Sequence, residues 1–288
     1  MGTFQEQRYR GEDTSDASSA AKIAANNVSR IFSVKNLGEA GRSEFVAISR
    51  LNLTVNDGEF LAILGPSGCG KSSFLDIVAG LARPTSGEIL INGIPVQGPS
   101  LDRGIVLQGY ALFPWRTVRE NVEFGLEIKK TSKRERREIS RDYLELVGLQ
   151  DFAERYPHEL SGGMKQRVAI ARALAFNPEI LLMDEPFGAL DSQTREMLQD
   201  ELLRIWDETK KTILFVTHSI DEAVFLADRV AVMTSNPGTI QDIVDIPLPR
   251  PRQGSGIRLS PEFGRVRHRI WELLHTGTEG EAKHNRAI

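Results

Sequence analysis

Residues 60–72 read Phe-Leu-Ala-Ile-Leu-Gly-Pro-Ser-Gly-Cys-Gly-Lys-Ser, and this stretch decides the fold. Five apolar residues before Gly65 indicate a buried strand, and a helix is predicted from Ser72 to Leu81. The loop between them fits the pattern G-x-x-x-x-G-K-[ST] in the strand-to-helix context that confirms it. Its glycines let backbone N–H groups point at phosphate oxygens, and the helix presents its positive end to the same anion. The stretch predicts a phosphate-binding loop, with Lys71 on the β- and γ-phosphates and Ser72 on Mg²⁺.

Short apolar runs alternate with helical patterns along the rest of the chain. Strands are predicted at Ile180–Met183, Thr212–Val216 and Val230–Met233, with a helix at Ala223–Ala227. This alternation indicates an α/β fold with a mostly parallel sheet that is covered on both faces. Residues from about 115 to 175 are charged and helix-like, so we expect them to form a helical subdomain inserted into the α/β core.

Two carboxylates, Asp184 and Glu185, end the apolar run that begins at Ile180. The carboxyl edge of such a sheet is where ligands bind. Asp184 is therefore expected to hold Mg²⁺ through water, and Glu185 to polarise the attacking water. Acids after a strand often only cap a helix, but the phosphate loop in the same chain favours the catalytic interpretation.

A second anion-binding helix start is predicted at Leu160-Ser-Gly-Gly-Met-Lys-Gln166, which leads into a helix from Arg167 to Ala175. Ser161 is a good N-cap, and the two glycines after it expose backbone N–H groups. A plain helix cap is the alternative interpretation.

Together these motifs resemble the ATP-binding-cassette (ABC) ATPases over residues 26 to about 245. The resemblance implies a P-loop NTPase (RecA-like) core with an inserted α-helical subdomain and a small antiparallel β subdomain. It also implies that two cassettes pair head to tail, with ATP between the Walker motifs of one copy and the signature motif of the other. The matching segments are the Walker motifs Gly65–Ser72 and Ile180–Glu185, the glutamine loop at Gln108, the signature Leu160–Gln166, Gly188–Asp191 and the switch histidine His218.

The same resemblance assigns roles to individual residues. Ser161 and Gly163 would touch the γ-phosphate held by the partner, Gln108 would bind Mg²⁺ and sense the membrane subunit, and Asp191 would communicate across the dimer. The catalytic residues would be Lys71, Glu185 and His218, and the Mg²⁺ ligands Ser72, Gln108 and Asp184. The residues expected around ATP are Phe32, which would stack on adenine, Gly65, Pro66, Ser67, Gly68, Cys69, Gly70, Lys71, Ser72, Ser73, Gln108, Ser161, Gly162, Gly163 and Asp191.

A narrower resemblance is to importers of the nitrate, sulfonate and taurine group. It rests on Gln108–Trp115, the Met164-Lys165 variant of the signature, Asp245–Arg252 and the segment Phe263–Leu274. The chain departs from the usual pattern at Ser73, where Thr is common, and at Gly109, where an acidic or polar residue is common. Neither departure removes a catalytic group, and Gly109 would give the loop more backbone freedom.

The composition excludes several other classes of protein. The 288 residues carry a net charge of -3, which gives no general attraction to nucleic acid or to anionic lipid. The basic stretch Lys129–Arg137 is interleaved with glutamates, which is typical of a solvated helix face. The single cysteine allows no intramolecular disulfide, which fits a reducing compartment. Neither a secretory signal nor a run of about 20 apolar residues is expected.

The chain is expected to divide into three parts. Residues 1–25 are polar and aperiodic and should form a flexible tail, and residues 26–250 should form the ATPase domain. Residues 251–288 should add a helix, since Phe263, Val266 and Ile270 recur at helical spacing, followed by a flexible tail from Thr276.

We therefore expect a peripheral ATPase on the cytoplasmic face of the cell membrane. Its partners would be a second copy of itself, permease subunits and, indirectly, an extracytoplasmic solute-binding protein, with no nucleic acid. The apolar cluster Leu112–Trp115 would either accept a short permease helix or simply pack between subdomains. Alternatives are an exporter or lipid-transport ATPase, or a soluble cassette protein of DNA repair or translation. The solute stays open among nitrate, sulfonates, taurine, bicarbonate and thiamine precursors.

Overall fold

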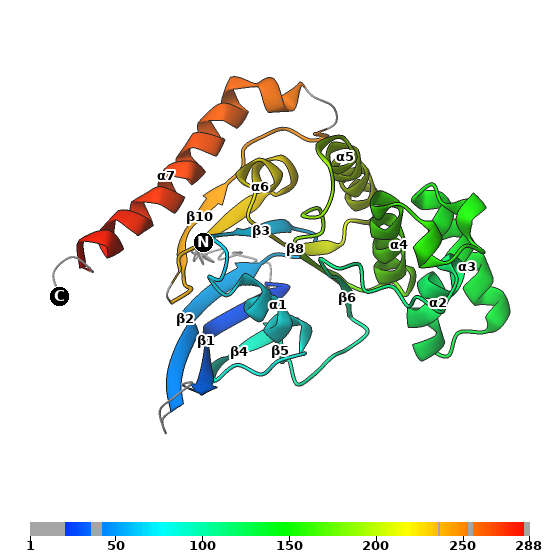
Figure 1. The fold of residues 1–288 in the computed structure, drawn as a ribbon, viewed down its shortest axis with the longest axis horizontal. Helices are drawn as coiled ribbons and strands as arrows, with labels where there is room; N and C mark the ends of the chain where they lie inside the picture. Colours follow the sequence, from blue (N-terminus) through cyan, green and yellow to red (C-terminus); the bar gives the residue numbers. More distant parts are fainter. Residues whose placement is uncertain (1–20, 36–41, 236, 253–255, 285–288) are drawn as a thin grey trace, which may run out of the picture.

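The computed structural model describes residues 21–35, 42–235, 237–252 and 256–284. Within these ranges the chain forms two β-sheets, and most of the α-helices lie around the larger sheet while the smaller sheet lies at an edge of the molecule (Figure 1). No helix in these ranges combines the length and the apolar character that crossing a membrane requires.

The larger sheet has six strands in the order β10-β9-β3-β8-β7-β6, and only the β10–β9 pair is antiparallel. The four strands predicted from apolar runs are confirmed as β3, β7, β8 and β9 to within one residue at each end. The bounds are β3 Phe60–Leu64, β6 Arg103–Val106, β7 Ile180–Asp184, β8 Thr212–Thr217, β9 Arg229–Met233 and β10 Ile240–Asp245.

Strand β3 divides its side chains between two hydrophobic cores. Phe60, Ala62 and Leu64 face one core, whereas Leu61 and Ile63 face the other. Successive side chains of a strand point to opposite faces of the sheet. A strand that is apolar at every position must therefore be covered on both sides, as its sequence predicted.

The helices cover the two faces of this sheet unequally (Figure 1). Helices α4 to α7 lie over one face, and α1 shares the other face with the second sheet. Helices α2, α3 and α4 pack together at one end of the molecule. The bounds are α1 Lys71–Ala79, α2 Val118–Ile128, α3 Lys133–Leu146, α4 Gly162–Ala175, α5 Ser192–Thr209, α6 Ile220–Leu226 and α7 Pro261–His284, with short 3₁₀ turns at Gln150–Phe152, Pro157–Glu159 and Ile257–Leu259.

The second sheet is antiparallel, with the strand order β2-β1-β4-β5. Its first strand begins at Ile23, so the expectation of a tail through residue 25 is wrong for the last three residues. Ile23 and Ala25 are buried and pair with both β2 and β4, which a short run of small residues did not signal. Residues 1–20 of that expected tail lie outside the described residues. The bounds are β1 Ile23–Lys35, β2 Arg42–Val55, β4 Ser86–Ile91 and β5 Ile94–Pro95.

The chain after β10 is held against α6 and β9. The expected C-terminal helix is confirmed as α7, with Phe263, Val266 and Ile270 buried. Its helical backbone continues to His284, so the tail expected from Thr276 is wrong over those residues. Before α7, the fully buried Arg252 donates to backbone carbonyls, and burial lowers the pKa of this side chain to about 10. The accepting carbonyls belong to Val224, Phe225, Ala227, Ile246 and Leu248.

Candidate functional site: a phosphate-binding cavity

The loop between β3 and α1 exposes backbone N–H groups to a ligand. Gly70 stands at the N-cap of α1 with φ 99°, and no side chain caps the helix there. A Cβ on Gly70 would lie 2.9 Å from both the Ala47 carbonyl oxygen and the Ile48 side chain, so this position needs glycine for space as well as conformation. The uncapped N–H groups at the start of α1 can therefore bind an anion.

Lys71 points from the start of α1 back into its own loop. Its ammonium group donates to the carbonyl oxygens of Gly65 at 2.8 Å and Pro66 at 2.9 Å. The side chain is only 4% exposed, and Nζ lies 4.0 Å from Glu185 Oε1. The loop thus holds a nearly buried cation in place with neutral acceptors.

Asp184 and Ser72 bring two oxygen donors together beside the loop. The Ser72 hydroxyl donates to Asp184 Oδ1 at 3.1 Å, which joins α1 to the end of β7. Burial raises the pKa of Asp184, and a cation bound beside it would favour the ionised carboxylate. Hydroxyl and carboxylate oxygens suit Mg²⁺, which usually takes its other ligands from water and phosphate. Among the described residues, no group of three or more His, Cys, Asp or Glu side chains is placed to hold a metal ion.

Glu185 has an unusual backbone conformation for a residue with a side chain. Its φ of 43° is left-handed, and its N–H donates to the Val216 carbonyl at 2.9 Å. Strained backbone of this kind is concentrated at functional sites. The carboxylate Oε2 lies 2.9 Å from Nδ1 of His218, which follows β8. Two residues 33 positions apart in the sequence therefore form one polar pair beside the phosphate loop.

A cavity of about 400 Å³ lies at this site, with Lys71, Ser72 and Glu185 among the residues that line it. Phe32 of β1 lies directly opposite Phe45 of β2, and both rings are partly exposed at the cavity. The guanidinium of Arg30 stacks on Phe32 at 4.7 Å. Sequence reasoning missed Phe45 because only the strand pairing places it beside Phe32. The cavity is lined by Phe32, Phe45, Ala47, Ser67, Gly68, Gly70, Lys71, Ser72, Ser73, Gln108 and Glu185.

Cys69 differs from its neighbours in the loop. It was expected among the residues around the nucleotide, but its side chain is 1% exposed and belongs to the core beneath the loop. Burial also raises the pKa of the thiol. The expectation is therefore wrong for the side chain of Cys69, which the tight turn directs into the core. Only the backbone of Cys69 belongs to the phosphate-binding loop.

The start of α4 lies outside this cavity. Ser161 caps α4 by accepting from the N–H of Met164 at 3.3 Å. A Cβ on Gly163 would lie 2.7 Å from Thr194, so the starts of α4 and α5 pack closely. Asp191 caps α5 by accepting from the N–H of Thr194 at 3.0 Å, and this bond lowers the pKa of its carboxyl group. None of the side chains that line the phosphate-loop cavity belongs to these two caps.

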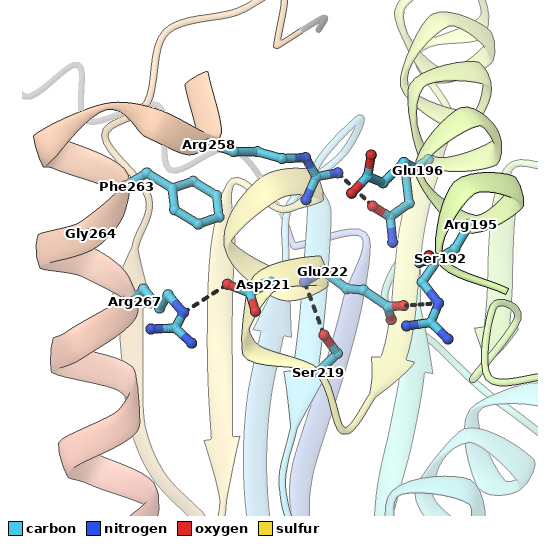
Figure 2. A pocket seen from close by; sticks show the side chains of 11 residues that line it. Ser192, Arg195, Glu196, Ser219, Asp221, Glu222, Arg258, Phe263, Gly264 and Arg267 are labelled. Carbon is cyan, nitrogen blue, oxygen red and sulfur yellow. Dashed lines mark hydrogen bonds and ion pairs between the residues drawn. The ribbon is translucent and has the colours of Figure 1, made fainter. Parts of the chain in front are cut away.

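A larger cavity of about 530 Å³ lies between α5, α6 and α7 (Figure 2). Two arginines at this cavity, Arg267 of α7 and Arg258 of the turn before it, have partners within the chain. Arg267 donates to Asp221 at 2.8 Å, and Arg258 donates to Gln199 at 2.6 Å. Acidic and basic side chains alternate around the cavity and no phosphate-binding loop reaches it, so it suits a nucleotide poorly. The contact between Arg267 and Asp221 instead holds α7 against α6, the helix that follows His218.

Comparisons of the sequence with known proteins identify its family. A family model described as ABC transporter matches residues 48–188. A protein of Brucella abortus named for ATP binding is 57% identical, covering 80% of this chain and 88% of the relative. The nitrate import ATP-binding protein NrtD of Synechococcus elongatus is 47% identical, covering 81% and 86%. The bicarbonate transport ATP-binding protein CmpD of Synechocystis sp. is 43% identical, covering 96% and 97%.

Solved structures show the same fold. The dimeric structure of the ABC transporter cassette MJ0796 matches with a TM-score of 0.68 and 37% identity, covering 78% of this chain and 98% of that one. A dimeric post-hydrolysis state of the same cassette, bound to ADP and Pi, matches with a TM-score of 0.67 and 36% identity over the same shares of the two chains.

Proposed function

The chain belongs to the ABC transporter family, and we propose that it is the ATPase subunit of an importer for a small oxyanion. Its fold is the expected P-loop NTPase core with inserted helices and a small antiparallel sheet. It is an ATPase that uses ATP and Mg²⁺. The observation that carries the site assignment is that Ser72 and Glu185 line one cavity with the phosphate loop, while Asp184 contacts Ser72 and His218 contacts Glu185.

Lys71, Ser72, Asp184 and Gln108 act on the phosphates in this proposal. The ammonium of Lys71 already lies at the loop, where phosphate oxygens would replace neutral carbonyls with charged acceptors. Ser72, Asp184 and Gln108 supply oxygen atoms for Mg²⁺, which when bound neutralises charge on the phosphates.

Glu185 is the proposed general base. Its carboxylate lines the cavity and can accept a proton from the attacking water. His218 fixes the orientation of this carboxylate through the 2.9 Å contact, and in this proposal it would also hold the γ-phosphate. The left-handed backbone of Glu185 gives the side chain this direction at the end of β7.

Replacing Glu185 tests the assignment. Glu185→Gln keeps the shape and removes the basicity, so hydrolysis should fall roughly 10²- to 10⁴-fold while ATP binding persists. Steady-state ATPase assays and nucleotide titration measure the two effects. Glu88→Gln, a matched change in β4 far from the cavity, should leave turnover unchanged. Near-normal hydrolysis by Glu185→Gln would refute the role.

Ser161, Gly163 and Asp191 are proposed to complete the site of a second copy. The starts of α1 and α4 can both receive an anion, and of these two only the start of α1 lines the phosphate-loop cavity. A head-to-tail dimer would place the start of α4 over the partner's γ-phosphate. The dimeric cassette structures support this arrangement.

A docking surface for the permease is proposed at the segment 112–115. Phe113 packs on Phe124 at 4.7 Å between ring centres, whereas Trp115 is 72% exposed. The segment is thus only partly used in packing between the helices, and the exposed Trp115 ring is available to a short membrane-subunit helix. This location would make the protein peripheral at the cytoplasmic face of the membrane, supplied by an extracytoplasmic solute-binding protein.

The solute is proposed from the relatives, because the ATPase subunit does not contact it. The relatives named for transport act on nitrate and bicarbonate, which favours these anions over sulfonates and taurine. The proposal is tested by measuring the uptake of labelled nitrate and bicarbonate in a strain that lacks the gene and in the same strain after the gene is restored. If the deletion leaves the uptake of both anions unchanged but abolishes growth on taurine or a sulfonate, the solute is one of the latter compounds.

A further inference from the structure

Two consecutive residues of the glutamine loop adopt left-handed backbone conformations. Tyr110 has φ 59° and Ala111 has φ 47°, and they follow Gln108 by two and three positions. Residues with a Cβ rarely occupy this region, and a pair of them needs support from the surrounding structure. The loop's internal backbone bonds, Tyr110 N–H to Leu107 O and Ala111 N–H to Gly109 O, are local and hold only the turn itself.

The support comes from Arg172 in helix α4. One guanidinium nitrogen donates to the Tyr110 carbonyl at 2.9 Å, and the other donates to the Ala111 carbonyl at 2.5 Å. The planar fork of arginine suits two neighbouring acceptors, and a lysine could satisfy only one of them well. Burial of the guanidinium at these carbonyls lowers the pKa of Arg172.

The side chain of Tyr110 contacts the opposite end of the same helix. Its hydroxyl oxygen lies 3.2 Å from the position that a Cβ on Gly162 would occupy, and Leu190 lies 3.6 Å from that position. Gly162 is the first residue of α4 and directly follows its cap, Ser161. Ten residues of helix, about 15 Å, separate Gly162 from Arg172. The glutamine loop is thus attached to both ends of α4.

We propose that Arg172 and Tyr110 are positioning residues that make the glutamine loop and the start of α4 move as one body. The inference rests on the proposed function, in which Gln108 binds Mg²⁺ in its own cavity and Ser161 meets the partner's nucleotide. When Gln108 shifts toward the nucleotide, the two attachments carry the shift to Ser161. The link therefore acts on closure and hydrolysis, and not on the first binding of ATP.

The first test separates turnover from binding and stability. Arg172→Met should lower kcat roughly 10- to 100-fold, because small misplacements at a distance are costly, while the ATP affinity of the monomer stays unchanged. Arg172→Lys should be intermediate. The matched control is Arg167→Met, which removes a single bond to the Val147 carbonyl from the same helix and has no contact with the glutamine loop.

Thermal unfolding of each variant shows whether the fold is retained, and light scattering in a Glu185→Gln background reports ATP-driven dimerisation. The proposal predicts weaker dimerisation for Arg172→Met than for Arg167→Met at similar stability. Equal kcat values for the two variants would overturn it, as would a loss of ATP affinity by Arg172→Met that matches its loss of turnover.

A compensating pair tests the Tyr110 contact without relying on Arg172. Gly162→Ala should reduce kcat, because its methyl group meets the Tyr110 hydroxyl, and Tyr110→Phe should restore much of the loss by making room. An additive effect of the two changes would refute the contact's role. Two further variants, Gln108→Ala and Ser161→Arg, test the proposed function separately from the link. If both of these variants retain full turnover, the proposed function is wrong. If both lose turnover while Arg172→Met turns over normally, only the proposed link is refuted.

Discussion

Lys71 illustrates at the scale of one residue how a buried charge is kept ready for a ligand. Two backbone carbonyls hold its ammonium in place, and the nearest carboxylate oxygen, on Glu185, is 4.0 Å away. Neutral acceptors keep the charge desolvated and directed without neutralising it. A phosphate that enters the cavity therefore meets a cation that needs little rearrangement.

The corresponding prediction is that Lys71→Ala weakens ATP binding strongly and abolishes turnover with little change in fold. The lysine head serves the ligand, and its loss leaves two loop carbonyls that water can reach through the open cavity. Titration with a fluorescent nucleotide and thermal unfolding measure the two effects. Lys133→Ala, at the exposed start of α3, is the matched control. Unchanged nucleotide affinity would count against the assignment.

Cys69 gives a pH-dependent prediction. Burial raises the pKa of its thiol, so at neutral pH the thiolate fraction is smaller than for a free cysteine and alkylation should be slow. The rate should increase as the pH rises towards this raised pKa, and bound ATP should protect the residue. Labelling should inhibit wild-type ATPase activity and spare Cys69→Ala. Equal inhibition of both proteins, measured after the same treatment, would show that the reagent acts elsewhere.

At the scale of elements, α7 and the turn before it contact two helices of the ATPase domain. Arg267 connects α7 to α6, and Arg258, in the turn before it, reaches α5 (Figure 2). Helix α6 begins two residues after His218, and α5 begins directly after Asp191; both residues belong to the proposed site. The C-terminal segment therefore helps to fix the positions of loops that are far from it in the sequence.

Truncating a buried side chain of α7 should destabilise the whole cassette. Ile270 is 0% exposed, so Ile270→Ala should reduce the free energy of unfolding by about 2–5 kcal/mol. Leu259 is 83% exposed, and Leu259→Ala should change it by less than about 0.5 kcal/mol. Urea titration followed by circular dichroism compares the two variants. A similar small effect for both would mean that α7 does not contribute to the core.

At the scale of the whole molecule, the proposed function requires one chain to contain two half-sites. The cavity with Lys71 is closed on one side by its own loop, whereas the cap at Ser161 lies outside it. In the proposed dimer each cavity is completed by the other copy. Such an arrangement couples ATP binding to association, because the ligand favours the closed pair.

Mixing two inactive variants tests this arrangement. Ser161→Arg should bind ATP as a monomer but fail to close, and Lys71→Ala should not bind ATP. A heterodimer of the two has one site with both defects and one intact site, so some hydrolysis should return on mixing equal amounts. ATP-driven dimerisation of Glu185→Gln chains, followed by light scattering, provides an independent measurement. If those chains bind ATP and never dimerise, the shared-site proposal is wrong.

The sequence by itself determined the local parts of this protein. The β3–loop–α1 unit spans Phe60 to Ala79, and the acids at the end of β7 and the helix start at Ser161 are each contained in a still shorter stretch of consecutive residues. Continuous apolar runs and glycine patterns predict such units because their physical causes, burial of a central strand and the freedom of the glycine backbone, act over short distances.

Only the tertiary structure decided which distant groups meet. The antiparallel sheet places Phe45 beside Phe32, and neighbouring parallel strands place His218 beside Glu185. The same holds for Arg172 at the glutamine loop and for the inward direction of Cys69. Strand order, register and helix packing fix these contacts, and they depend on the burial of the whole chain. No pattern of neighbouring residues encodes them, because each contact depends on where separate elements pack.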